Sequence, residues 1–167
     1  MTDAIGSVYL TEALRVLRQY QELGSRAMLQ LEPADFFRTS DEESNSVAVI
    51  VKHLAGNMRS RWTDFLTTDG EQPDRDRDGE FELAVSTTPA DVRRWWEDGW
   101  HCVFTALTPL RPDDLLRTVT IRGEPLTVLE AIDRQVAHYA YHVGQIVQLA
   151  RHFAGPRWQT LSVPRRR

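Results

Sequence analysis

The sequence has one cysteine, one lysine and no long hydrophobic run. Cys102 stands alone, which excludes an internal disulfide and any metal site built from several thiolates. No apolar run approaches the roughly 18 residues that a membrane-spanning helix needs, and the first residues lack the basic-then-apolar order of a signal peptide. We therefore expect a cytoplasmic protein without a membrane partner.

The charge distribution offers no basic face. Lys52 is the only lysine among 20 basic residues, and the arginines are interspersed with 24 acidic residues to give a net charge of −4. This pattern argues against nucleic-acid binding. With 167 residues, of which 41% are hydrophobic, the chain is long enough for one sizeable core. We expect a single domain over residues 1–155, followed by a basic, solvated tail over 156–167.

Apolar residues recur at helical spacing in four segments: 5–31, 47–66, 89–107 and 128–154. The β-branched start of the second segment would also suit a buried strand, but its length and its later periodicity favour a helix. The polar residues 41–45 are suited to capping this helix. Four amphipathic helices in a chain of this size are expected to bury their apolar stripes against one another.

Local signals mark where the later helices begin. Thr88 before Pro89 predicts an N-cap, and Thr127 with Glu130 three residues later predicts a capping box. The stretch from Arg117 to Pro125 reads as a short strand entering a turn, so a small hairpin is expected before the last helix.

The stretch from Thr67 to Pro89 is rich in glycine, proline and alternating charges and should be irregular. A connection of this length is usually functional or mobile, which makes it a candidate lid or crossover. It is too long for a tight antiparallel turn. The predicted fold is therefore all-α, a four-helix bundle in up-down-down-up order with a long crossover between the second and third helices.

Three histidines are candidates for metal ligands. His138 and His142 are four residues apart, so on a helix both rings can reach one ion, and His53 lies in a separate apolar segment where an unpaired polar ring would be costly to bury. The alternative is that these histidines are exposed or hydrogen-bonded in the core, since such a pair also arises by chance. Cysteine is excluded, so histidines and carboxylates would have to hold any metal.

Polar residues share the helix faces of these histidines. Asn57 and Gln145 are candidates for orienting a substrate or a ligand imidazole, with buried polar pairing across the bundle as the alternative. Arg61, together with Arg75 and Arg77, could bind substrate carboxylates, although arginines in a charge-alternating loop are more often solvated.

The segment Ser46–Met58 with Arg61-Trp62, and the run His138-x-x-x-His142-Val143-Gly144-Gln145-Ile146, resemble the DinB/YfiT-like superfamily, in its poorly characterised bacterial branch. The likeness runs from the first helix to Ala150. It implies an up-down-down-up bundle, often a homodimer, with nickel or zinc held by three ligands, here His53, His138 and His142. Many relatives have arginine where this chain has Val143, so no role for that arginine carries over.

Characterised members of this superfamily include thiol-dependent S-transferases and an isomerase that use bacillithiol, mycothiol or glutathione. The leading hypothesis is therefore a metal-dependent S-transferase that joins a small-molecule thiol to an electrophile. One alternative is metal-assisted hydrolysis at the same histidines. Another is a non-enzymatic, stress-related metal-binding dimer, for which Trp95, Trp96 and Trp100 would supply an interface unless two of them pack in the core.

Overall fold

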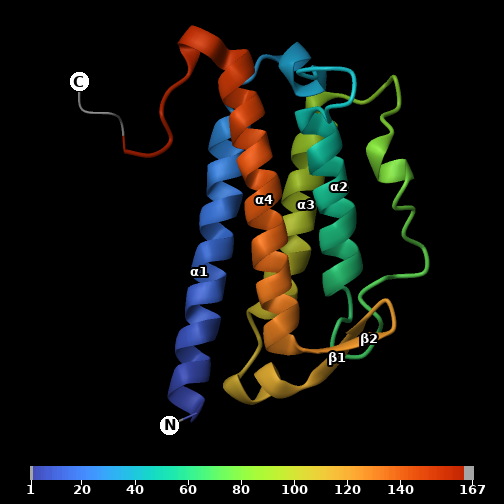
Figure 1. The fold of residues 1–167 in the computed structure, drawn as a ribbon, viewed down its shortest axis with the longest axis vertical. Helices are drawn as coiled ribbons and strands as arrows, with labels where there is room; N and C mark the ends of the chain where they lie inside the picture. Colours follow the sequence, from blue (N-terminus) through green and yellow to red (C-terminus); the bar gives the residue numbers. More distant parts are fainter. Residues whose placement is uncertain (1, 164–167) are drawn as a thin grey trace.

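The computed structural model describes residues 2–163, and within this range it contains four long helices and a small antiparallel hairpin (Figure 1). The helices are α1 (Thr2–Met28), α2 (Val47–Trp62), α3 (Pro89–Leu107) and α4 (Val128–Ala154), and the strands are β1 (Thr118–Ile121) and β2 (Glu124–Thr127). Short 3-10 helices lie in the connections, at Pro33–Phe37, Gly79–Phe81, Pro112–Leu116 and Gly155–Arg157. The predicted helical class and the small hairpin are confirmed.

The helices begin where short polar side chains cap them. Thr88 is the N-cap of α3 and Thr127 forms the capping box of α4, both as predicted, and Thr88 forms a capping box as well. The cap of α2 is Ser46, whose hydroxyl accepts from the backbone N–H of Val49, so it lies just after the polar run expected to supply it. The second helix also ends at Trp62, earlier than predicted, because the chain turns through Asp64 with a φ of 48°.

The core forms between two pairs of helices. α2 packs mainly on α3 and α1 mainly on α4, while α2 and α4 meet across the middle of the bundle. Trp100 and Tyr139 are among the largest fully buried side chains, and the indole N–H of Trp62 donates to the Tyr139 hydroxyl at 2.8 Å. Trp96 is buried as well and only Trp95 is half-exposed, so these tryptophans serve packing and give no support to an interface.

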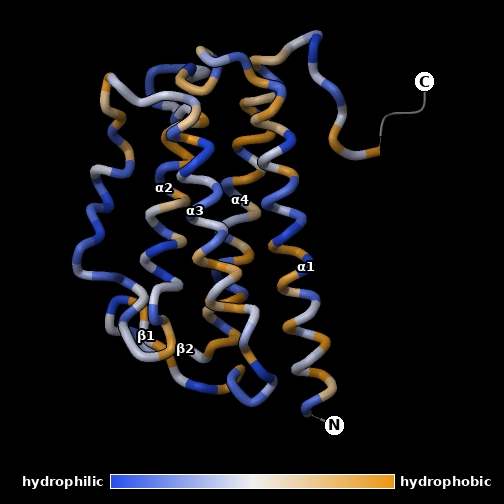
Figure 2. The backbone as a smooth tube through the Cα atoms, turned by 180° about the vertical axis from the view of Figure 1, so that it is seen from behind, coloured by the Kyte–Doolittle hydropathy of each residue, from blue (hydrophilic) through white to orange (hydrophobic). Residues whose placement is uncertain are grey.

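The connection between α2 and α3, residues 63–88, is called the crossover here. Figure 1 shows it running alongside α2 from one end of that helix to the other. Figure 2 shows that the stretch beside the helix is mostly hydrophilic. A hydrophilic segment of this kind buries little apolar surface, so polar contacts must hold it in place.

The crossover is tied to the hairpin at its first end. The hairpin turn uses Arg122 and Gly123, both with positive φ (58° and 74°), as a two-residue type I′ turn requires. The Asp69 carboxylate accepts from the backbone N–H groups of these two residues at 2.8 and 2.7 Å. The Gly70 N–H also donates to the Thr120 carbonyl oxygen at 2.8 Å. The hairpin therefore fixes the start of the crossover.

The basic tail after Ala154 is docked against the bundle as far as Leu161. Arg157 forms an ion pair with Glu32 at 2.8 Å, and Gln30 and Gln159 exchange two hydrogen bonds. Most residues of this part are exposed, as expected of a solvated tail, and Trp158 and Leu161 are the half-buried ones that pack against the core. The last four residues, 164–167, lie outside the described range. No helix in the described part of the chain is long and apolar enough to cross a membrane.

Candidate metal centre

The three histidines predicted to bind a metal lie together between α2 and α4. One ring nitrogen of each of His53, His138 and His142 lies within 4.8 Å of the other two. The ring centroid of His53 lies 5.5 Å from the ring centroid of His138 and 5.0 Å from that of His142. The three side chains are therefore close enough to hold one metal ion. Within residues 2–163, this is the one group of three or more such side chains with that spacing.

The spacing of the pair on α4 fits a shared cation. The Nε2 atoms of His138 and His142 are 3.1 Å apart. Two nitrogens bound to one zinc ion by bonds of about 2.0–2.1 Å would be separated by about 2.9–3.4 Å, for angles between a right angle and the tetrahedral value. Two N–H groups cannot face each other at this distance, so either one shared proton or a cation must lie between the rings.

Burial keeps these two rings uncharged. Burial, reinforced by the charges that His142 and His53 would carry, lowers the pKa of His138 to about 3. Burial also lowers the pKa of His142, although the hydrogen bond with Gln145 opposes this effect. Neutral imidazole is the form that binds metals, so the site presents ligands in the right state at neutral pH.

Glu80, a residue of the crossover, contacts the third histidine. Its Oε2 atom lies 2.9 Å from Nδ1 of His53, and the carboxylate is only 6% exposed. Burial opposes ionisation of this group, but the hydrogen bonds from His53 and Arg75 outweigh it and lower the Glu80 pKa. A carboxylate that accepts from Nδ1–H fixes the tautomer with Nε2 free, which is the usual arrangement behind a metal-bound histidine.

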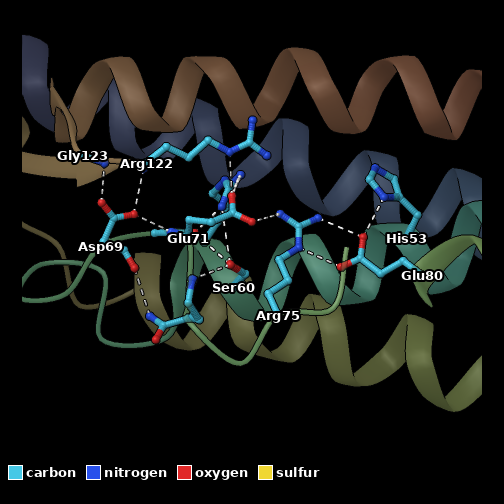
Figure 3. A network of polar contacts seen from close by, with 11 residues as sticks. His53, Ser60, Asp69, Glu71, Arg75, Glu80, Arg122 and Gly123 are labelled. Atoms are coloured by element: carbon cyan, nitrogen blue, oxygen red, sulfur yellow. Dashed lines mark hydrogen bonds and ion pairs between the residues drawn. The ribbon is translucent and has the colours of Figure 1, made fainter. Parts of the chain in front are cut away.

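Glu80 is itself held by a buried ion pair. Arg75 donates from Nε to Oε1 and from Nη2 to Oε2, at 2.7 and 2.9 Å, and its side chain is only 3% exposed. Arg75 also reaches Glu71, which pairs in turn with Arg61 at 2.8 Å and Arg122 at 2.9 Å. Figure 3 shows the resulting chain of ion pairs from the hairpin to His53. We call it the ion-pair chain.

The backbone around Glu80 is clamped to α2. Lys52 donates to the carbonyl oxygens of Gly79 and Glu82 at 2.7 and 2.6 Å, one on each side of Glu80. The ring of Phe81 stacks on that of His53, with centroids 5.0 Å apart. Gly56 leaves the space for the carboxylate, since a Cβ there would lie 2.2 Å from Oε1 of Glu80. Three residues within little more than one turn of α2 thus hold the turn that places Glu80.

The three residues predicted to bind substrate lie near the histidines in different environments. Gln145 Oε1 lies 2.8 Å from Nδ1 of His142, so this side chain orients the His142 imidazole. Asn57 is buried, and its Oδ1 atom has no protein partner among the described residues. Arg61 is buried against Gly70 and Glu71, which favours a structural role; contact with a substrate stays a prediction for all three.

The two arginines of the crossover lie in different environments. Arg77 is exposed, as the alternating charges suggest, but the expectation of a solvated Arg75 is wrong, because its guanidinium is buried against Glu80 and Glu71. Sequence reasoning gave Glu80 no role. The available signal was Gly56, a glycine inside a helix, which often marks the close approach of another group.

These features define a helical protein with a three-histidine cluster, in which the rings of His53 and His142 are oriented by side chains of the crossover and of α4. Over residues 4–167 the chain matches the model of a family described as "Protein of unknown function (DUF1572)". The match covers nearly the whole chain, and the protein belongs to this family. No curated protein matches the sequence.

Proposed function

We propose that the protein binds one divalent metal ion, zinc or nickel, through His53, His138 and His142, and uses it to transfer a small-molecule thiol to an electrophile. The observation that carries the proposal is the convergence of three imidazole nitrogens within 4.8 Å, from two helices, with no fourth such ligand in the described part of the chain. Three protein ligands are typical of catalytic metal sites, and four are typical of structural ones.

The surrounding residues suit this role. Glu80 and Gln145 accept from Nδ1–H of His53 and His142, which leaves both Nε2 atoms without a proton of their own, and that of His142 faces Nε2 of His138 at 3.1 Å. Phe81 covers one face of His53 and limits the access of water to it. A bound metal ion would supply Lewis acidity, which lowers the pKa of a thiol. In the transfer, the thiol proton leaves to solvent, sulfur bonds to the electrophilic carbon, and the leaving group departs with its electron pair.

The proposal includes kinship with the DinB/YfiT-like superfamily. The placement of the ligands, one on the second helix and two on the fourth, supports it. So does Figure 1, in which α1 and α4 run in one direction and α2 and α3 in the other, the up-down-down-up order. A homodimer is part of the same proposal. Exposed Ile5 and Val8 on α1 offer apolar surface for it, and light scattering at twice the 19.2 kDa chain mass would support it.

The metal site is tested by elemental analysis of protein purified without an affinity tag. We expect about one equivalent of zinc or nickel in the wild type and its loss in His142→Ala. His152→Ala is the matched control, because His152 is exposed near the end of the same helix and should leave the metal content unchanged. Metal that is absent from the wild type, or equal in all three proteins, would refute the three-histidine site.

The reaction is tested with monochlorobimane and a panel of thiols, with and without a chelator. Turnover that the chelator abolishes and His142→Ala lacks would support the transferase. Metal binding without turnover of any thiol would favour a structural metal in a non-enzymatic dimer. Chelator-sensitive hydrolysis of an ester or amide panel, without thiol transfer, would favour the hydrolase instead.

A further inference from the structure

A groove of about 510 Å³ lies beside the three-histidine cluster, between the C-terminal half of α4, the start of α2 and the segment that precedes α2. Tyr141 and Gln145 line it, and both contact His142: the Tyr141 ring lies 4.7 Å from the imidazole, and Gln145 is the hydrogen-bond partner of that ring. Ile50, one helical turn before His53, lines the opposite side.

The groove continues the line of the ligands along both helices. On α4, positions 138, 142, 145 and 149 share one face, and the last two line the groove. Its lining on this helix runs from Tyr141 to Leu149, a length of about 12 Å at 1.5 Å per residue. None of the three histidines lines the groove itself, so a molecule whose reacting atom lies at the cluster would extend along the groove past Tyr141 and Gln145, which contact His142.

The lining is neutral or acidic. It is formed by apolar side chains and by serine, asparagine and glutamine, with Glu43 as its one charged residue, and no lysine, arginine or histidine of the described chain lines it. Glu43 follows Asp41 and Glu42, and Asp41 is held by the Ser44 hydroxyl and the Glu43 N–H at 2.6 and 3.0 Å. The arginines near the cluster, Arg61 and Arg75, have their guanidinium groups in the ion-pair chain.

We propose that this groove holds the organic part of the substrate and selects uncharged or cationic molecules over anionic ones. The inference rests on the proposed function, since it places the reacting atom at the three-histidine cluster. An anion would meet the Glu43 carboxylate and no compensating cation, whereas hydroxyl or ammonium groups find acceptors in Glu43 and the neutral amides. Its carbon chain would pack on Ile50 and Leu149.

Gly144 allows the groove to be filled without touching a ligand. It is exposed, lines the groove, and a Cβ built on it would meet no atom within 4 Å. Gly144→Leu therefore adds bulk to the groove and should not weaken the helix, because leucine is a better helix former than glycine. Gly144→Ala is the matched control that leaves most of the space free.

The test measures the binding of three thiols of equal chain length to cobalt-loaded protein: 6-mercaptohexanol, 6-aminohexanethiol and 6-mercaptohexanoate. Their dissociation constants follow from the sulfur-to-cobalt absorption band, and 2-mercaptoethanol serves as a short probe that does not reach along the groove. We expect the alcohol and the amine to bind several-fold more tightly than the carboxylate, since Glu43 is exposed and water screens part of its charge. Glu43→Gln should reduce the preference for the amine over the carboxylate several-fold, and Glu42→Gln, outside the lining, should not.

Gly144→Leu should weaken the binding of all three long thiols at least tenfold and leave 2-mercaptoethanol and the cobalt content unchanged. Equal or tighter binding of the carboxylate, or an unchanged affinity of the long thiols for Gly144→Leu, would overturn the proposed groove while the metal site stands. Wild-type protein that binds no cobalt would overturn the metal site and the groove proposal with it. The cobalt content of each sample therefore separates the two failures.

Discussion

Replacing Glu80 with glutamine should weaken metal binding even though no ligand is changed. The substitution keeps the size of the side chain but removes the charge that accepts from His53 at 2.9 Å and from Arg75 at 2.7 and 2.9 Å. Removing the partner that orients a ligand histidine typically costs 10–100-fold in metal affinity. We expect the dissociation constant for zinc, measured by competition with a chromogenic chelator, to rise within that range.

The same substitution should also destabilise the metal-free protein. It leaves the buried Arg75 guanidinium with Glu71 alone, at 3.3 Å, and breaking a buried ion pair of this kind typically costs about 3–5 kcal/mol. The free energy of unfolding, measured in urea, should fall by about this amount or less, since Glu71 retains part of the interaction. Glu82→Gln is the control, because this exposed side chain lies on the same clamped turn.

Zinc affinity and the free energy of unfolding together show whether Glu80 positions His53 for metal binding or only stabilises the fold. A Glu80→Gln protein that is less stable, but binds zinc within twofold of the wild type when folded, would show that Glu80 only supports the crossover. An unchanged stability would refute the reasoning about the ion-pair chain instead.

Three further predictions follow from the contacts of the site. Gly56→Ala should weaken zinc binding like Glu80→Gln without altering any charge, because its Cβ would displace the Glu80 carboxylate; equal affinity by chelator competition would contradict this. Tyr139→Phe should lower the free energy of unfolding by about 1–3 kcal/mol, since it leaves the buried Trp62 N–H without its acceptor, while zinc affinity stays unchanged. In the folded, metal-free protein the pKa of His138 is about 3, and the pKa of His142 is also lowered. In the unfolded chain both pKa values lie near 6.5, so below that pH the unfolded state binds more protons than the folded state. Stability should therefore fall as pH drops from about 6.5 toward 3, by at most about 1.4 kcal/mol per pH unit for each ring, and His138→Gln should flatten the slope in urea titrations; a wild-type stability independent of pH would contradict the assignment.

The helices could be predicted because their signals are local. Thr88 and Thr127 cap α3 and α4 through bonds to residues three positions away, and the apolar periodicity needs no knowledge of the partner helix. The end of α2 was less predictable. Phe65 is buried and continues the helical pattern, yet it contributes to the core from a turn, which periodicity alone does not distinguish from a helix.

The pairing of His138 and His142 was predictable for a similar reason, the place of His53 beside them was implied by the family resemblance, and the residues that orient the rings were not predictable. His138 and His142 are joined by helical spacing, but Glu80 reaches His53 only because the crossover folds back along α2. In the sequence, Arg75 lies within an alternation of opposite charges, which is typical of solvated loops. Its burial depends on Glu71, whose position depends in turn on Arg61 and Arg122, and none of these pairs has a periodic signature.

This dependence links the irregular part of the chain to the chemistry of the site. The hairpin turn anchors Asp69, Glu71 lies two residues further on, and the ion-pair chain then leads through Arg75 and Glu80 to His53. We therefore expect a substitution in the hairpin to alter the affinity of the proposed metal site even when all three histidines are intact. The guanidinium groups of Arg61 and Arg75 are engaged in this chain, and for this reason we assign the proposed substrate recognition to the neutral and acidic groove along α4.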